Sequence, residues 1–140
     1  MTYDIKFTHL PHIFVLVLLL SSVFAAHARD NQNRPDTHEG KYFRVTYQSS
    51  VKPLPLNRMH WWTLNISTLD GKPVEDATIH VYGGMPAHRH GLPTEPEASA
   101  TGGGEYIVKG LKFSMTGEWE VWFDITASGM NEKVMFKFEL

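Results

Sequence analysis

Cysteine is absent from this 140-residue sequence. Its absence excludes disulfides, cysteine-ligated zinc, iron–sulfur clusters, thiol redox chemistry and the thiolate ligand of blue-copper sites. The chain must therefore obtain its stability from an apolar core alone. No apolar run after residue 28 is long enough to cross a bilayer.

Clusters of basic residues are also lacking. The full sequence has 13 Lys plus Arg and 15 Asp plus Glu, and only Asp4 and Lys6 of these precede residue 29. The remaining chain is mildly negative, so we do not expect it to bind nucleic acid.

The first 28 residues have the pattern of a secretory signal. An unbroken apolar run, Ile13 to Leu20, is followed by the small-residue cleavage pattern Ala26-His27-Ala28. We predict a signal peptide over residues 1–28, a mature chain that begins at Arg29, and a periplasmic or secreted location with no membrane span. The alternative is an uncleaved N-terminal anchor. Residues 29–40 are polar and without periodicity, and are predicted to be a flexible tail.

The rest of the chain, residues 41–140, alternates with a period of two and shows no helical period. Strands are predicted at 41–47, 59–69, 74–82, 105–114, 118–127 and 133–140, and residues 51–56 form at most an edge segment because they contain two prolines. About seven short strands with regular turns predict an all-β domain, an immunoglobulin-like antiparallel β-sandwich without a disulfide. An aromatic core is expected from Phe43, Trp62, Tyr106, Phe113, Trp119, Phe123, Phe136 and Phe138.

A loop rich in methionine and histidine follows the strand predicted at 74–82. Gly83 and Gly84 are expected to end that strand, and the loop then presents Met85, His88 and His90 between prolines. Thioether sulfur suits Cu(I), and imidazole suits copper, zinc, iron and nickel. The loop is therefore a candidate copper site. The alternative is that Met85 caps the core and the histidines are ordinary surface residues.

Two further residues extend this candidate site. Met115 lies in a turn before Trp119 and is either a second thioether ligand or a methionine at the edge of the core. His60 begins a strand and shares a face with Trp62, so it is either a ligand at the rim or a capped polar group. No Ser/His/Asp arrangement and no phosphate-binding loop is recognisable, so we do not predict an enzyme.

Three segments together resemble the bacterial YtkA-like and FixH-like domains. They are Gly71-Lys72-Pro73-Val74-Glu75-Asp76-Ala77, then Gly83-Gly84-Met85-Pro86 with His88 and His90-Gly91-Leu92-Pro93-Thr94, and then Gly104-Glu105-Tyr106 to Gly110-Leu111-Lys112-Phe113-Ser114-Met115-Thr116-Gly117 with Trp119-Glu120-Val121. The resemblance covers about residues 41–140. Its most specific parts are the loop and the Met-Thr-Gly-x-Trp segment.

The resemblance implies a small exported or membrane-tethered β-sandwich. It also implies an association with copper handling and respiratory oxidase assembly. The family's motif residues match at Met85, His88, His90 and Met115, which implies that the loop and the Met115 turn meet. This chain differs from FixH-type members in retaining no membrane span if the signal is cleaved.

The sequence therefore supports two alternative hypotheses for the function. The first is an exported copper-binding protein that passes the ion to a copper-accepting or respiratory-assembly protein of the envelope. The second is a metal-free module that binds another envelope protein through a sandwich edge or through an outward face carrying Trp61 and Trp122.

Overall fold

The computed structural model describes residues 36–140. The signal peptide predicted for residues 1–28, the alternative anchor and residues 29–35 of the predicted tail lie outside the described residues. Residues Pro35–Leu140 form a compact unit with its own core.

The described residues form nine β-strands and no helix, which confirms the predicted all-β class. In particular, they include no helix of a length and hydropathy that would span a membrane. The strands are β1 Asp36–Glu39, β2 Phe43–Ser49, β3 His60–Thr68, β4 Thr78–Met85, β5 His90–Gly91, β6 Glu97–Gly102, β7 Glu105–Leu111, β8 Glu118–Ala127 and β9 Met130–Glu139.

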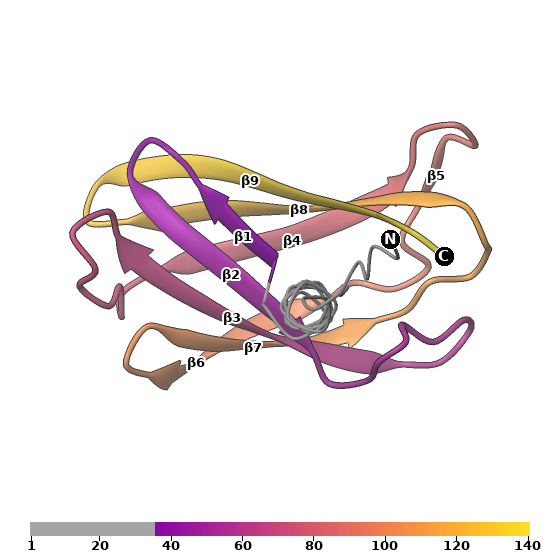
Figure 1. Cartoon of the computed structure of the whole chain (residues 1–140), viewed down its shortest axis with the longest axis horizontal. Coiled ribbons are helices and arrows are strands. Elements are labelled where there is room, and N and C mark those ends of the chain that lie inside the picture. Colours follow the sequence, from indigo (N-terminus) through magenta and orange to yellow (C-terminus); the bar gives the residue numbers. More distant parts are fainter. Residues whose placement is uncertain (1–35) are drawn as a thin grey trace, which may run out of the picture. The chain divides into compact units, whose positions relative to one another are not determined.

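The strands form two antiparallel layers that almost close on each other (Figure 1). One layer has the order β1-β2-β3-β7-β6, and the other has β4-β8-β9 with β5 paired to β4. A single residue pair, His80 with Glu97, joins β4 to β6, and β1 lies near β9 on the opposite side. The result is a barrel-like sandwich.

Three strands were not predicted, and all three are short and lie at the margins of the layers. The prediction of a flexible tail over residues 29–40 is wrong for residues 36–39, which form β1. This strand pairs with β2, with Asp36 opposite Tyr47 and Glu39 opposite Arg44. Strands β5 and β6 form within the predicted loop between the glycines and the strand at 105. Exposed marginal strands need no apolar alternation, because their stability comes from backbone pairing with a buried neighbour.

The two glycines predicted to end a strand instead continue it, since β4 runs through Gly83 and Gly84 to Met85. A Cβ at Gly83 would stand 2.5 Å from the carbonyl oxygen of Glu120, and one at Gly84 would collide with the carbonyl oxygen of His90. The glycines thus allow close backbone approach on both sides of β4.

The core confirms the predicted inward faces. Trp62, Trp119, Phe43, Phe113 and Phe123 are completely buried, and Phe138 is partly buried against them. The register between β3 and β7 shifts between the pairs His60–Leu111 and Trp61–Lys109. Gly110, at a φ of 88°, is therefore the extra residue of a β-bulge.

Two polar side chains fasten separate parts of this sandwich. The Glu132 carboxylate on β9 accepts hydrogen bonds from the backbone N–H groups of Lys41, Tyr42 and Phe43 at 2.5, 3.0 and 2.8 Å. The Tyr106 hydroxyl on β7 donates to the carbonyl of Val74 and accepts from the N–H of Ala77, each at 2.9 Å. Because these contacts join distant segments, they fix how the layers meet.

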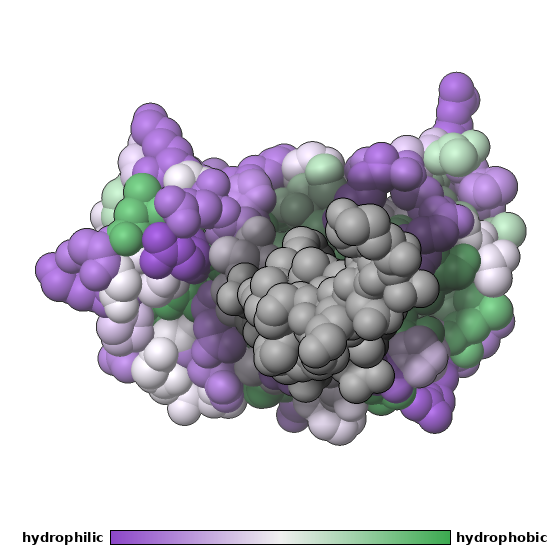
Figure 2. Space-filling view, in the orientation of Figure 1, coloured by the Kyte–Doolittle hydropathy of each residue, from purple (hydrophilic) through white to green (hydrophobic). Residues whose placement is uncertain are grey.

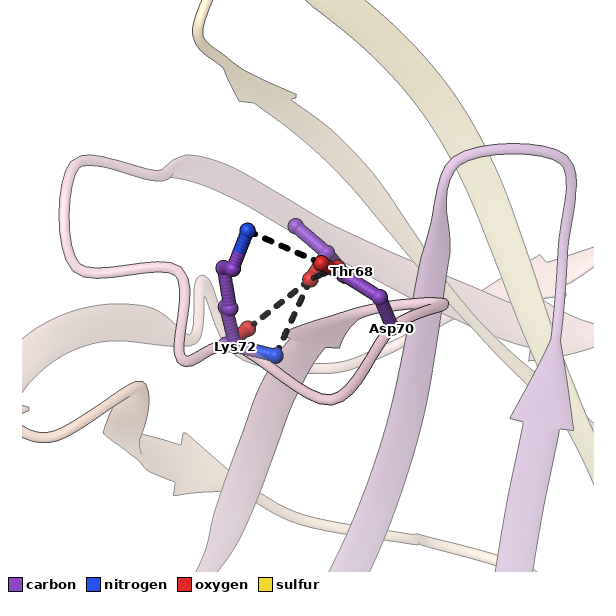
Figure 3. A network of polar contacts seen from close by, with 3 residues as sticks. All are labelled: Thr68, Asp70 and Lys72. Atoms are coloured by element: carbon purple, nitrogen blue, oxygen red, sulfur yellow. Dashed lines mark hydrogen bonds and ion pairs between the residues drawn. The ribbon is translucent and has the colours of Figure 1, made fainter.

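The turn between β3 and β4 is closed by a small polar network (Figure 3). The Thr68 hydroxyl bonds to the Asp70 carboxylate, and it also accepts the N–H of Lys72 at 3.0 Å. The Lys72 ammonium pairs with Asp70 at 2.9 Å. The hydrogen bond from Thr68, followed by Lys72, lowers the pKa of the Asp70 carboxyl.

Candidate functional site

Strand directions bring all five predicted ligands to one end of the sandwich. The start of β3 lies beside the end of β7, where His60 is opposite Leu111. The end of β4 lies beside the start of β8, where Gly84 is opposite Glu120. We call this the site end; it consists of residues 50–60, the hairpin 85–90, the turn 112–117 and the C-terminus, all at the right in Figure 1.

Met85 is the innermost of the five. Its side chain is only 1% exposed and belongs to the core cluster. A Cβ at Gly117 would stand 2.8 Å from its terminal methyl group, so the turn that follows Met115 lies directly against it. The hairpin and the turn therefore meet, through Met85 and Gly117.

Met115 lies in the same turn but faces solvent, with 40% of its surface exposed. Its carbonyl oxygen accepts a hydrogen bond from the indole N–H of buried Trp119 at 3.0 Å. The N–H and carbonyl of Gly117 both pair with Leu140, at 2.8 and 3.0 Å. The Met115 thioether is thus free at the surface while its backbone is held in place.

His88 and His90 lie at the exposed tip of the β4–β5 hairpin. In an extended chain, residues two apart point in opposite directions. Here Arg89, at a φ of 54°, interrupts the extension, and the N–H of His88 bonds to the carbonyl of Met85 at 3.1 Å. The two imidazole centroids come to lie 6.0 Å apart, with ring planes inclined by 19°.

An open cleft of about 430 Å³ runs alongside this hairpin. It is lined by Gly84, Pro86, Arg89, His90 and Trp122, among others. His90 is therefore reachable from solvent beside the hairpin.

His60, at the start of β3, is buried, with only 4% of its surface exposed, unlike the two hairpin histidines. Its ring neighbours are Phe113 at 5.3 Å and Trp62 at 6.5 Å, not the hairpin histidines. Burial lowers the pKa of the imidazole, so the neutral form is favoured. Nδ1 lies 3.2 Å from the carbonyl of Arg58, whereas Nε2 is buried without a partner among residues 36–140.

The five groups do not form one ready-made cage. Residues 36–140 contain no cluster of three His, Asp or Glu side chains suited to a metal ion. The accessible donors are His88, His90 and Met115, while Met85 and His60 are internal.

The outward face expected to carry two tryptophans is not formed. Trp61 lies on β3 and is 50% exposed, whereas Trp122 lies on β8 in the other layer and stacks with Tyr82 at 6.4 Å. Since the inner faces of both layers fill the core, these two rings point away from opposite sides of the sandwich.

Sequence analysis missed two residues of this region. The packing of Gly117 against Met85 could not be predicted, because glycine is common in turns whether or not a side chain lies against it. The structure shows why glycine is needed here, since its φ is 122°. The carbonyl of Arg58, which orients His60, carries no sequence signal because any residue could supply it.

The family comparison agrees with the motif resemblance. The model of the YtkA-like family matches residues 43–123. The chain belongs to the YtkA-like family. No curated protein matches it in sequence.

Two solved structures resemble the fold. A crystal structure of a DUF4426 family protein from Pseudomonas aeruginosa PAO1 has a TM-score of 0.57 at 14% identity, covering 76% of this chain and 94% of its own. The GAE domain of GGA2p from Saccharomyces cerevisiae has a TM-score of 0.44 at 7% identity, covering 76% of this chain and 97% of its own. At 14% identity, the first likeness establishes the fold alone.

Proposed function

We propose that the protein is an exported copper-binding protein that holds the ion at the site end and passes it to a partner. The observation that supports this most directly is the grouping of His88, His90 and Met115, two imidazoles and a thioether, accessible at one end of a rigid sandwich. Thioether and imidazole donors suit copper better than magnesium or calcium, which prefer oxygen.

The spacing of the two hairpin histidines fits a shared ion. Metal–imidazole bonds are about 2.0–2.1 Å long, so two imidazoles on one ion have centroids roughly 5–6.5 Å apart. The observed separation is 6.0 Å. Small rotations of two exposed side chains on a short hairpin are enough to direct their nitrogens at one ion.

The buried thioether of Met85 supplies an inner ligand beneath the exposed ones. Because it is 1% exposed and covered by Gly117, an ion reaches it only when the turn moves aside. Cu(I) favours a second thioether, whereas Cu(II) is satisfied by imidazoles, so Met85 tunes the site toward the reduced ion. His60, with an unpartnered Nε2, is the most internal candidate.

A carrier needs ligands that can be exchanged, and exposed donors at a hairpin tip meet that requirement. Rigid β4 and β8 hold the hairpin, and the bond from Trp119 holds the turn, so an incoming protein meets fixed donors. The acceptor in this proposal is a copper-accepting or respiratory-assembly protein of the envelope. The ion is cargo, and no catalytic step is assigned to the protein.

The test is a Cu(I) titration of the chain from residue 29 onward against a competing chelator. We expect one ion per chain, with affinity reduced roughly a hundredfold or more in the triple variant His88→Ala, His90→Ala, Met115→Leu. Met85→Leu, which keeps the volume of a core side chain, is expected to weaken Cu(I) and leave Cu(II) binding unchanged.

The matched control replaces the same residue types elsewhere on the surface. His38→Ala, His80→Ala and Met130→Leu remove two histidines and one partly exposed methionine from positions outside the site end. This control should bind copper like the wild type. Equal affinity of the wild type and the first triple variant would refute the proposal and favour the metal-free interaction module.

A further inference from the structure

The loop that leads into β3 and the first residues of that strand expose a group of large apolar side chains. Leu56, Met59 and Trp61 are 46%, 57% and 50% exposed, although they lie within six consecutive residues. Figure 2 shows green apolar surface between purple polar groups at the right-hand end of the molecule. Solvent exposure of three such side chains is costly unless something covers them.

Three basic residues occur in the same loop or in the segment beside it. Lys52 and Arg58 are exposed in the same loop, and Lys112 is half-buried next to it, since Leu56 bridges to Phe113. None of the three forms an ion pair within the described residues, whereas Arg44, Lys72, Lys133 and Lys137 each pair with a carboxylate. We call Lys52, Leu56, Arg58, Met59, Trp61 and Lys112 the basic apolar patch.

The two segments that build the patch contain no acidic residue at all. Asp and Glu are absent from residues 40–69 and again from residues 106–117. The acidic groups around these segments belong to other parts of the chain. Glu95 lies just before β6, and its backbone approaches Gly110 as the Met59 side chain does. Glu97 on β6 is opposite Lys109, Glu118 on β8 is paired with Lys137, and the C-terminal residue Leu140 pairs with Gly117. The six residues of the patch thus carry three positive charges and no negative one, on a chain with a net charge of −2.

We propose that the basic apolar patch binds the surface of a membrane that contains anionic lipids. Tryptophan, leucine and methionine insert at the level of the headgroups, while lysine and arginine extend their charged ends to lipid phosphates. Each basic residue near an anionic membrane strengthens binding by about fivefold. The insertion of a few apolar side chains and the attraction of a few basic ones are each too weak to hold a protein on a membrane, so both contributions are needed.

Other occupants fit the patch less well. A symmetric second copy would bring like charges face to face, because a two-fold interface uses the same surface twice. An acidic protein would neutralise the charge, but protein interfaces are depleted of lysine, and two of the three basic residues here are lysines. A fluid lipid surface tolerates lysine and needs no complementary shape.

This inference does not depend on copper binding, because no residue of the patch is a proposed ligand. It does add an orientation to the proposed function. The patch and the Met/His hairpin belong to the same end of the sandwich, so a bound membrane would hold the ion site close to membrane-embedded partners.

The experiment measures binding of the chain from residue 29 onward to lipid vesicles. This chain is used because residues 35–140 form a compact unit with its own core, and because the apolar run Ile13 to Leu20 would itself enter lipid. Vesicles of phosphatidylcholine with and without phosphatidylglycerol are compared by co-sedimentation and by tryptophan emission. We expect binding only with phosphatidylglycerol, a blue-shifted emission, and loss of binding at high salt.

Two variants locate the surface. Lys52→Glu with Arg58→Glu should reduce binding at least about twentyfold, as expected for two basic residues at roughly fivefold each. Trp61→Ser should abolish the blue shift and weaken binding. The matched control, Lys41→Glu with Lys72→Glu, makes the same change in net charge at the opposite end and should bind like the wild type.

Several results would overturn the proposal. The first is that the protein binds neither kind of vesicle. The second is that the two double variants bind equally well. The third is that the protein binds polyglutamate but no lipid, which would indicate that the partner of the patch is an acidic protein. A dimer in light scattering that dissociates in the Trp61→Ser variant would assign the patch to a second copy. Copper affinity measured on the same variants separates this outcome from that of the proposed function, since the patch variants should bind copper normally.

Discussion

The terminal methyl group of Met85 lies against Gly117, at the point where a Cβ on residue 117 would be only 2.8 Å away. This contact joins the Met/His hairpin to the turn that carries Met115. It also buries one thioether and leaves the other exposed. Any change in this contact should therefore alter both the stability and the accessibility of the site end.

We first predict that Gly117→Ala destabilises the protein by about 2–4 kcal/mol. The new methyl group would collide with Met85, and the φ of 122° is unfavourable for any residue with a side chain. Urea unfolding of the wild type and the variant measures the difference.

Gly129→Ala is the control for this prediction. Gly129 also has a positive φ, of 75°, but nothing lies within 4 Å of its added Cβ, so only the backbone cost of about 1–2 kcal/mol is expected. In a Met85→Ala background the excess cost of Gly117→Ala should disappear. Equal effects at Gly117 and Gly129 would show that the contact contributes nothing.

A second prediction concerns pH and His60. Burial lowers the pKa of this imidazole below its ordinary value of 6.5, so the unfolded chain binds the proton more readily than the folded one. Between the two pKa values, the free energy of unfolding rises with pH and is lost as the pH falls through about 6.5. Denaturation between pH 8 and pH 5, roughly, should show this loss.

His60→Phe should reduce the loss, because an apolar ring beside Phe113 takes up no proton. His80→Gln, at an exposed position, should leave the pH profile of the wild type unchanged. If the His60→Phe profile is parallel to that of the wild type, burial of this imidazole does not contribute to the pH dependence.

Third, Tyr106→Phe should cost about 1–3 kcal/mol. The variant keeps the buried ring but leaves the carbonyl of Val74 and the N–H of Ala77 without their partner. Tyr82→Phe is the control, because its hydroxyl is at the surface, where it makes a long contact of 3.4 Å to Asp124 and interacts with Lys133, and a change below about 0.5 kcal/mol is expected. Thermal unfolding of both variants distinguishes a buried link from a surface one.

Fourth, Glu132→Gln should destabilise the protein by about 1–3 kcal/mol. The carboxylate accepts three backbone N–H groups of residues 41–43, and an amide offers one acceptor oxygen and no charge. Amide hydrogen exchange should accelerate at Tyr42 and Phe43.

The comparison for Glu132 is Glu118→Gln. Glu118 pairs with Lys137 at 2.9 Å, but both side chains are nearly half exposed, so the change should stay within about 0.5 kcal/mol. An equally small effect at Glu132 would mean that the carboxylate does not fasten β9 to β2.

Several parts of the fold could be predicted from alternation alone. The stretch from Trp119 to Ile125 alternates over a full strand, and β8 spans Glu118–Ala127 as predicted. Because only one face of the strand is buried, apolar and polar residues must alternate with a period of two, and this alternation can be recognised in the sequence. Strands β1, β5 and β6 escaped prediction because they are marginal and polar, and backbone pairing leaves no pattern in side chains.

The candidate site was predictable only as a list of donors. His88 and His90 could be identified by type and spacing, but their 6.0 Å separation depends on the left-handed backbone of Arg89. Basic residues that are scattered along the sequence also gathered unexpectedly, since Lys112 joins Lys52 and Arg58 only through the contact between Leu56 and Phe113.

By itself the sequence determined that this chain forms an uncrosslinked all-β domain with an aromatic core, because the period of burial and the lack of cysteine leave few alternatives. Only the tertiary structure decided which donors are accessible. Met85 and Met115 are the same residue type, one at the end of a strand and one in a turn, yet Met85 is 1% and Met115 is 40% exposed. That difference arises where the turn at Gly117 crosses the end of β4, a long-range contact that no local pattern encodes.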